Sequence, residues 1–537
     1  MATYYIDPTG NDTTGDGSSG NPWASLYKAT SVVTSAGNTI YVNAGTYTET
    51  NQSVLAVGVS ILGAGATSII DFTYVSGTNF CIYAYSSSLT NGNQSISYVK
   101  ITGSDHTAYG GVYVHKRNNF KIHHCTFENF NKWGVRFIYP YSQGYENPTE
   151  FCTGNEFRYN IVRDCAGNNG GVDSCFGALG IDGQDGILVE YNNFYQDRTA
   201  GSNGMPIKGV TGINRGIKIR YNNIYMGLFE TGDYWDFAIE LWDCRGGVEI
   251  SYNYLEGSID IGGVRNLKGS SEYSAWVHNN TIKQVSQAVR EGTRGLIIEG
   301  TVRNEDIIFE KNHVLNTCAG VIWNIVGGSM SSERVKIRYN IFESMGLDDS
   351  QATNYKGWGI RGDASSNGTI DDVEIYNNVF TAKEGTYSTM WGIMIFPQII
   401  TNYKIKNNIV IGFDYAGVFG YNNGDSYITC DYLWIQNNIF YGNGNSNLPR
   451  YNGDYAPTNN TTENNITTDP LFVSSTNYRL QSESPAIDAG IDVGLTRDYD
   501  DKGVPYNGVP DIGAYEYGAL DPDIVITRAR INKYSVA

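Results

Sequence analysis

Charged side chains recur at one position of a repeated strand-like segment in this 537-residue chain. Each segment alternates apolar and polar residues; in FAIELW, for example, Ile239 and Leu241 are expected to point inward and Glu240 outward. Aligning the segments on their apolar residues predicts an outward row: His115, Arg136, Asp182, Lys208, Glu240, Asp260, Arg290 and, after an apolar break, Arg361. Only 17% of all residues are charged, so this row marks a candidate site.

Glu240 and Asp260 are the centre of the predicted row. Adjacent strands lie about 4.8 Å apart, so these two carboxylates should face each other on consecutive coils, with Lys208 and Arg290 on either side. Neighbouring residues complete the predicted site: Asp236 as a third carboxylate, and Trp235 and Trp242 as aromatic surface.

Two reactions on a polysaccharide would use these side chains. In β-elimination from a uronic-acid polymer, Lys208 would be the base that removes the C5 proton, and Arg290 would neutralise the substrate carboxylate. The oxygens of Asp236, Glu240 and Asp260 are suited to Ca²⁺. In glycoside hydrolysis, Glu240 and Asp260 would instead be the acid and the base or nucleophile. Like charges a few ångströms apart raise one of the two pKa values, as a general acid requires.

Five further side chains are predicted to bind the substrate, with the two tryptophans as stacking platforms for sugar rings: Arg136, Asp182, Trp235, Trp242 and Arg361. A purely structural interpretation stays open, because alternating charges on stacked strands often form a ladder of ion pairs.

A recurring asparagine phrase sets the register of this row. A short strand ends in Asn and an apolar residue follows, at Asn193, Asn223, Asn253, Asn280, Asn312, Asn340, Asn378, Asn408 and Asn438. The steps are 30, 30, 27, 32, 28, 38, 30 and 30 residues. A period of about 20–50 residues indicates a repeat architecture.

The repeating unit predicts an all-β solenoid, a single-stranded parallel β-helix, for which the crossover preference of parallel strands favours a right hand. Each copy holds strand-like pieces and no helix-length apolar stripe, which excludes leucine-rich and helical repeats. A propeller blade needs four strands in about 40–45 residues, more than a copy contains. The Asn is expected at the same corner of every coil, where its side chain bonds the next coil's amide and its tolerance of left-handed geometry suits the turn.

The domain boundaries follow from the repeat. Residues 1–50 are expected to form an N-terminal cap with the first strands, 51–465 a β-helix of about 11–13 coils, 466–518 an irregular C-terminal cap, and 519–537 a tail. Leu26, Ala29, Val33 and Ala36 are spaced as a short capping helix. The acidic positions of the C-terminal cap either stabilise its structure or hold a cation: Asp488, Asp498, Asp500, Asp511 and Glu516.

Charge and composition exclude some partners. The formal net charge of −18 repels nucleic acid and anionic membranes. The chain contains no run of 18 apolar residues, so we expect no membrane insertion. It also has no secretory apolar region at its start, which predicts either a removed signal or release without one. The eight cysteines are expected as buried thiols, with one disulfide among Cys152, Cys165 and Cys175 as the alternative.

Over essentially its whole length, the chain resembles the right-handed parallel β-helix (pectate-lyase-like) superfamily, of the secreted bacterial or phage tailspike and depolymerase kind. The opening segment YYIDPTGNDTTGDGSSGNPWASLYKA and the closing phrases SPAIDAG and DIGAYE carry this resemblance alongside the repeat. The resemblance implies an extracellular protein, secreted or virion-associated, that cleaves a polysaccharide through a groove on one flank, as a lyase or a glycoside hydrolase. Assembly as a homotrimer is compatible with it.

The resemblance leaves the reaction open. The hydrolases of the superfamily carry a GHG phrase, which this chain lacks, so no catalytic residue is carried over from them. A non-catalytic glycan-binding adhesin and a virion spike or fibre stay as alternatives.

Overall fold

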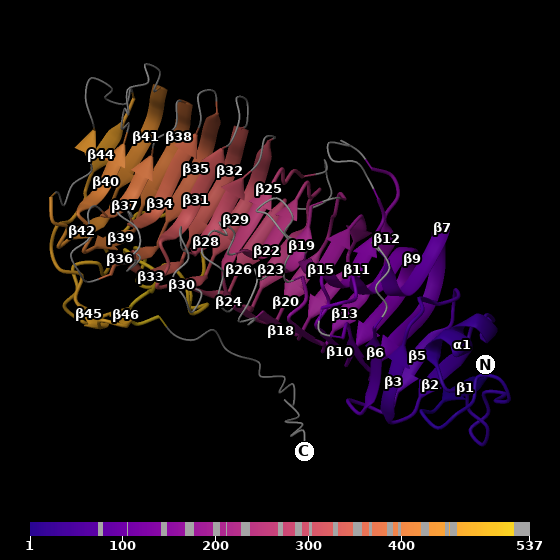
Figure 1. Ribbon diagram of the computed structural model, residues 1–537. Helices are drawn as coiled ribbons and strands as arrows, with labels where there is room; N and C mark the ends of the chain where they lie inside the picture. The colour runs from indigo at the N-terminus through magenta and orange to yellow at the C-terminus, as the bar shows by residue number, and fades with distance from the viewer. Residues whose placement is uncertain are drawn as a thin grey trace.

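The computed structural model describes residues 1–73, 79–104, 106–140, 148–166, 177–196, 204–210, 212–226, 237–266, 272–284, 293–299, 303–325, 331–346, 357–364, 368–383, 390–395, 399–419, 429–445, 450–451 and 459–519. Within them the chain forms a right-handed parallel β-helix that extends along one axis from the N-terminal to the C-terminal coils (Figure 1). The part of the chain that the structure covers has no helix long and apolar enough to cross a membrane.

A complete coil contains three strands, each of which stacks on its counterpart in the next coil. The first are the row strands, which carry the charged row: β4 (Ser53–Val54), β11 (Trp133–Ile138), β15 (Gly177–Asp182), β19 (Met205–Gly209), β22 (Phe237–Trp242), β25 (Ser258–Gly262), β28 (Arg294–Glu299), β31 (Ala319–Ile325), β34 (Gly357–Ala364), β37 (Met390–Ile395), β40 (Tyr415–Phe419) and β43 (Arg450–Tyr451).

The second are the corner strands, most of which end at the asparagine corner: β2 (Thr39–Val42), β5 (Ser60–Gly63), β13 (Glu156–Arg158), β17 (Leu188–Glu190), β20 (Lys218–Arg220), β23 (Val248–Ser251), β26 (Ala275–His278), β29 (Asn304–Glu310), β32 (Ser331–Arg338), β35 (Thr369–Tyr376), β38 (Ile399–Lys406), β41 (Thr429–Gln436) and β44 (Thr461–Glu463). Two long strands pair with both series: β7 (Phe80–Ser97) and β9 (Gly110–His123).

The third are the return strands, which follow the corner: β3 (Gly45–Glu49), β6 (Ser68–Phe72), β8 (Lys100–Thr102), β10 (Thr126–Glu128), β14 (Ile161–Arg163), β18 (Asn193–Gln196), β21 (Asn223–Met226), β24 (Tyr254–Glu256), β27 (Thr281–Lys283), β30 (His313–Leu315), β33 (Ile341–Met345), β36 (Val379–Ala382), β39 (Ile409–Ile411) and β42 (Ile439–Tyr441). They form one sheet of fourteen described strands. All but β3 fall within residues 51–465.

The corner is a continuous ladder of buried asparagines. At Asn222, the backbone N–H donates to Oδ1 of Asn253 at 2.9 Å, and Oδ1 accepts from the backbone N–H of Asn192 at 3.0 Å. Nδ2 of Asn222 donates to the carbonyl of Val189 at 2.9 Å. The same bonds join successive members of the ladder: Asn160, Asn192, Asn222, Asn253, Asn280, Asn312, Asn340, Asn378, Asn408, Asn438 and Asn465.

Two details of the predicted corner were wrong. In the first two copies the ladder residues are Asn192 and Asn222, whereas Asn193 and Asn223 begin the return strands and pair with each other. The left-handed backbone conformation belongs to the residue before the ladder asparagine, such as Tyr221 with a φ of 58°. Stacking of consecutive corner tyrosines helps to offset the strain of this conformation.

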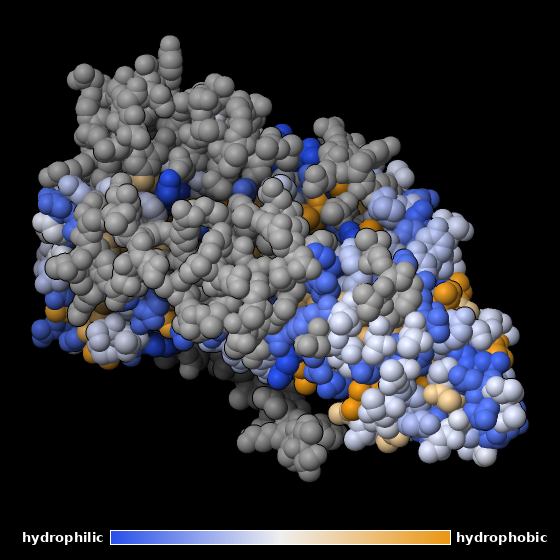
Figure 2. All heavy atoms as spheres, in the orientation of Figure 1, coloured by the Kyte–Doolittle hydropathy of each residue, from blue (hydrophilic) through white to orange (hydrophobic). Residues whose placement is uncertain are grey.

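Alternate residues of the row strands fill the interior. They form files of aliphatic side chains without exposed surface, for example Ile239, Ile259, Leu296, Val321 and Ile360. Figure 2 shows that the described surface of the N-terminal coils is mostly polar with scattered apolar patches.

The N-terminal cap contains the expected helix, α1 (Leu26–Val32), beside β1 (Thr3–Ile6). Ser25 caps it by accepting a hydrogen bond from the N–H of Lys28. The buried carboxylate of Glu49, in the first return strand, also accepts from the N–H of Leu26 at 2.5 Å. These contacts fix the helix at the end of the first coil.

The C-terminal segment 466–519, here called the strap, runs back along the corner, whereas a cap over the end of the stack had been expected. Its described strands are the antiparallel pair β45 (Phe472–Ser474) and β46 (Asn477–Leu480), which lie beside the last return strands (Figure 1). Asn437 and Asn407 donate to strap carbonyls at 2.9 and 2.8 Å, and Lys311 forms an ion pair with Asp501. The strap therefore extends from the corner of Asn437 back to that of Lys311.

The acidic residues of the strap act structurally. Asp498 accepts from the N–H groups of Asp500, Lys502 and Glu516 at 2.7 to 3.0 Å. The carboxylates of Asp511 and Glu516 likewise accept backbone N–H groups. These bonds hold the irregular loops of the strap in place.

Six cysteines are buried free thiols: Cys81, Cys125, Cys152, Cys165, Cys244 and Cys318. Cys152 and Cys165 are therefore not joined to each other, and Cys175 lies outside the described residues.

Candidate functional site

The parallel pairing of the row strands brings three predicted residues together. Lys208 of β19 pairs with Glu240 of β22, and Glu240 pairs with Asp260 of β25. Their neighbours inside the helix, such as Ile239 and Ile261, have no exposed surface. The apolar alternation thus directs the three polar side chains to the outer face of the same sheet.

The alignment was wrong at three other coils. Gly180 occupies the row position between Arg136 and Lys208, and Asp182 lies two residues further along β15, opposite Ile138. His115 is opposite Ile138 as well. Its ring Nδ1 lies 3.0 Å from the carbonyl of Ser86, a structural contact.

The third error concerns the coil after Asp260. Ile297 of β28 is opposite Asp260, where Arg290 had been expected. The segment GLIIE directs Leu296 and Ile298 into the core, and this is a stronger apolar alternation than AVREG offers. Arg290 lies outside the described residues, and so do Trp235 and Asp236.

The register of β28 also places near Asp260 a carboxylate that the sequence alignment missed. Glu299 lies at the end of β28, opposite Gly262, and is only 7% exposed. The negative charge of Glu299 raises the pKa of Asp260. Alternation within GLIIE was the available signal, since it places Glu299 on the outer face once Leu296 is assigned inward.

Each charged residue of the cluster has a defined partner. Lys208 Nζ forms an ion pair with Glu240, and Trp242 Nε1 donates to Asp260 Oδ2 at 2.8 Å. On the preceding coils, Arg136 binds Asp182 at 3.0 Å. Part of the predicted row is therefore a ladder of ion pairs, as the structural interpretation requires.

Glu240 and Asp260 differ in their electrostatic environments. Burial raises the pKa of Asp260 well above its usual range, and the charges of Glu299 and Glu240 raise it further. Burial also raises the pKa of Glu240, but the adjacent Lys208 ammonium opposes this. Asp260 Oδ1 is buried and has no hydrogen-bond partner among the described residues, which suits a protonated oxygen better than an ionised one. The environment therefore raises the pKa of Asp260 strongly, whereas at Glu240 the Lys208 ammonium opposes the rise.

The described carboxylates do not by themselves form a Ca²⁺ site. Within the residues that the structure covers, no three His, Cys, Asp or Glu side chains are grouped to hold a metal ion. Glu240 is engaged by Lys208 and Asp260 by Trp242. A Ca²⁺ site at this position would depend on Asp236.

Arginines of the row lie over aromatic rings on either side of the carboxylates. Arg136 is 4.6 Å from the ring centroid of Trp133, and Arg361 is 4.6 Å from that of Trp358. Ile297 and Ile322 separate Arg361 from Asp260, which confirms the apolar break. Stacking on the rings holds these planar guanidinium groups in place.

Comparison with known proteins finds no matching family model and no matching curated protein. Similar solved structures include the complex of alginate lyase AlyF-OU02 with G6, at 11% identity, covering 67% of this chain and 83% of that chain, with a TM-score of 0.40. Another is the tailspike protein of E. coli bacteriophage HK620 in complex with a pentasaccharide, at 12% identity, 86% and 78% coverage and a TM-score of 0.44. A rhamnogalacturonan lyase matches at 15% identity, 76% and 87% coverage and a TM-score of 0.32. At these identities the matches concern the fold, and no catalytic role is transferred from them.

Proposed function

We propose that this chain cleaves an extracellular or cell-surface polysaccharide by glycoside hydrolysis at Glu240 and Asp260. The observation that carries the proposal is a pair of adjacent carboxyl groups whose environments separate their proton affinities. Two carboxyl groups in different protonation states are the requirement for acid–base cleavage of a glycosidic bond.

Asp260 is the proton donor in this mechanism. It holds its proton because it is buried beside Glu299 and Glu240, and it passes the proton to the oxygen of the leaving sugar. Glu240 is the ionised partner, oriented by Lys208. Neighbouring parallel strands lie about 4.8 Å apart, which is closer to the roughly 5–5.5 Å of retaining enzymes than to the roughly 6.5–9.5 Å of inverting enzymes. Glu240 therefore attacks the anomeric carbon as the leaving sugar departs. Water activated by the deprotonated Asp260 then hydrolyses the bond between Glu240 and the sugar, and the anomeric configuration is retained.

The ion pair of Lys208 favours hydrolysis over β-elimination. Elimination needs a neutral amine at Lys208, whereas an ammonium group engaged by Glu240 has no lone pair to accept the C5 proton. Arg290, the group expected to neutralise a substrate carboxylate, is replaced by Ile297 at the position opposite Asp260.

The remaining predicted residues extend the groove on both sides of the carboxyl pair. In this proposal Arg136, Asp182 and Arg361 bind sugar hydroxyls. Trp242 stacks on the sugar ring next to the cleaved bond, since its indole already contacts Asp260; Trp235 has the same role. Localisation outside the cell follows from the substrate, and a homotrimer remains a prediction for sedimentation analysis.

The test is a screen of acidic and neutral polysaccharides with the full-length protein, with two measurements: new reducing ends and the ultraviolet absorbance of unsaturated sugars. We expect reducing ends without absorbance. On the substrate found, Glu240→Gln and Asp260→Asn should each lower kcat roughly 100-fold or more. Glu128→Gln is the matched control, because Glu128 pairs with Lys100 at 2.5 Å on the return strands, away from the row.

Three outcomes would change the proposal. Full activity in both row variants would show that the site is wrong. Ultraviolet absorbance from the products would show that the reaction is elimination and not hydrolysis. Loss of this absorbance on chelation would support a Ca²⁺ site that includes Asp236. Glycan binding without turnover would favour the adhesin or virion-spike alternative.

A further inference from the structure

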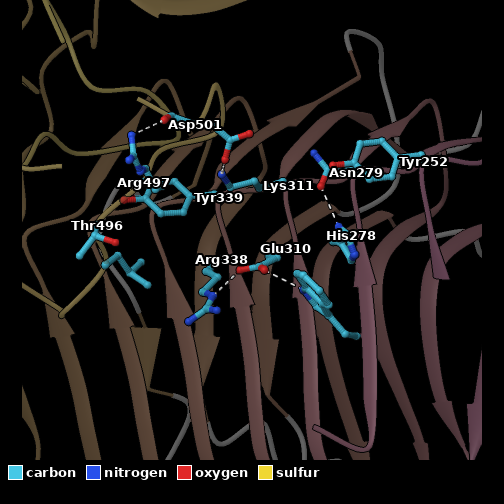
Figure 3. Close-up of a pocket in the computed structure, with 12 residues that line it drawn as sticks. Tyr252, His278, Asn279, Glu310, Lys311, Arg338, Tyr339, Thr496, Arg497 and Asp501 are labelled. Carbon is cyan, nitrogen blue, oxygen red and sulfur yellow. Dashed lines mark hydrogen bonds and ion pairs between the residues drawn. The ribbon is translucent and has the colours of Figure 1, made fainter. Parts of the chain in front are cut away.

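A pocket of about 310 Å³ lies on another flank of the β-helix, between the corner strands and the strap (Figure 3). One wall is built by the ends of β26, β29 and β32, where His278, Glu310 and Arg338 are paired across adjacent strands. Leu495, Thr496, Arg497 and Asp501 of the strap form the opposite side. The volume suits a small ligand or a single unit of a longer one.

Aromatic rings form one face of this pocket. Trp276 and His278 are stacked with 3.7 Å between ring centroids. Tyr252 meets His278 edge-on, at 5.6 Å and 80°. Such a group of rings offers an apolar platform of the kind on which the C–H face of a sugar packs.

Tyr252 ends a stack of exposed corner rings. Tyr159, Tyr191, Tyr221 and Tyr252 stack at 5.0 to 5.1 Å, and each is 40 to 47% exposed. Within the stack each inner ring is covered on both faces by its neighbours. In the next coil the corner residue is Asn279, so the stack of tyrosines stops at the pocket, where Tyr252 meets His278.

Polar groups beside the rings are held in fixed positions. Glu310 accepts from Trp276 Nε1 at 2.7 Å and from Arg338 Nε at 2.6 Å, and Figure 3 shows its carboxylate beside Arg338. Carboxylate and guanidinium groups anchored in this way bind sugar hydroxyls without reorganising. Tyr339, which also lines the pocket, has a buried hydroxyl with no hydrogen-bond partner among the described residues.

The charge of the pocket differs in sign from that of the protein. Its lining has three cations, Lys311, Arg338 and Arg497, against the two carboxylates of Glu310 and Asp501, in a chain with a net charge of −18. Lys311 and Arg338 are paired with these carboxylates. The exposed Arg497 donates through Nη1 to the backbone carbonyl of Asp501 at 3.0 Å and has no carboxylate partner among the described residues.

We infer that this pocket binds one acidic sugar unit, a uronate residue of a glycan chain. The sugar ring packs against Tyr252 and Trp276, its hydroxyls bind Glu310 and Arg338, and its carboxylate binds Arg497. The site lies on the corner strands and the strap, whereas Glu240 and Asp260 lie on the row strands. The pocket therefore binds a glycan independently of the cleavage site. A glycan chain held in the pocket has a higher effective concentration at Glu240 and Asp260 than a free chain has.

Calorimetric titration of the full-length protein tests this inference, with an oligouronate and a neutral oligosaccharide of equal length as probes. We expect the oligouronate to bind at least tenfold more tightly, with an affinity that falls as salt is added. Arg497→Gln should remove the preference for the acidic probe, and Trp276→Ala should weaken both probes at least tenfold. Arg303→Gln, an exposed arginine outside the pocket that pairs with Glu305 and Glu333, is the matched control and should bind as wild type does.

The outcomes separate this inference from the proposed cleavage. Measured in the Glu240→Gln background, where no cleavage occurs, the loss of acidic preference caused by Arg497→Gln should be the same as in wild type, so failure of the proposed cleavage leaves the pocket intact. Equal affinity for both probes, or unchanged binding by a correctly folded Arg497→Gln protein, would overturn the inference. If inorganic sulfate bound as tightly as the oligouronate, the pocket would be a general anion site and the assignment to a sugar would be wrong. Circular dichroism of each variant establishes folding.

Discussion

Replacing Asn222 with alanine should destabilise the solenoid far more than the same change at the adjacent Asn223. Both residues belong to one YNN phrase. Asn222 has no exposed surface and belongs to the ladder. Asn223 is partly exposed, and its Nδ2 donates to Asn193 at 2.9 Å. The pair is a matched comparison of two positions that differ only in their place at the corner.

The magnitude follows from the groups left without partners. Without the Asn222 side chain, the buried N–H of Asn192 loses its acceptor and the carbonyl of Val189 loses a donor. Each buried group left unsatisfied costs about 1–3 kcal/mol, so we expect a loss of about 2–6 kcal/mol. At Asn223, one bond in a partly solvated position is removed, at a cost of about 0.5–1.5 kcal/mol.

Urea denaturation followed by circular dichroism measures the two losses. Because coils of a solenoid can unfold in segments, amide hydrogen exchange at Asn192, whose N–H donates to Asn222, should be measured as well. We expect this amide to lose protection in Asn222→Ala and to keep it in Asn223→Ala. Equal losses in the two variants, or a loss below about 0.5 kcal/mol for Asn222→Ala, would refute the assignment of the ladder.

Three more predictions concern pH, the strap and the core. Burial raises the pKa of Glu49 to about 7, so the folded state binds the carboxyl proton of Glu49 more tightly than the unfolded chain does. The contribution of this proton to the free energy of unfolding is complete below about pH 4.5 and is lost as the pH rises through 7. Thermal unfolding should therefore show a lower Tm at pH 8 than at pH 5, and Glu49→Gln should reduce the difference; an unchanged pH profile would contradict this role. Asp501→Asn removes the ion pair with Lys311, which is worth about 0.2–1 kcal/mol. This variant should speed proteolysis of the strap by up to about fivefold. A proteolysis rate equal to that of wild type would show that the ion pair does not hold the strap. Gly320→Ala should cost about 1–3 kcal/mol in urea denaturation, because a Cβ would lie 2.4 Å from Cδ1 of Phe342; a variant as stable as wild type would show that this packing can relax.

The alignment of the row was predicted correctly where the row strands keep a constant phase. Lys208, Glu240 and Asp260 each stand between inward aliphatic residues that are unmistakable in sequence, and the pairing aligns them as expected. The alignment failed where the loop before a row strand changes length. At β15 one outward residue was exchanged for another two positions away, Asp182 for Gly180. At β28 the residue opposite Asp260 is Ile297, seven positions after Arg290.

The pocket beneath the strap could not have been found by sequence reasoning. Its aromatic wall comes from the corner strands, and Arg497 and Asp501 follow about 190 residues after Lys311. The phrases of the closing segment indicate a cap, but they contain no periodicity that fixes where the cap packs.

By itself the sequence determined that this chain forms a parallel β-helix, because the period of the asparagine phrase and the strand alternation repeat in every coil and need only local geometry and the next coil. It also determined the ladder to within one residue. Tertiary structure alone decided which of two adjacent asparagines enters the ladder, which carboxylates gather around Asp260, and where the strap packs. Those outcomes depend on the register between strands and on the packing of an irregular segment, and both are set by contacts between residues that the local pattern does not connect.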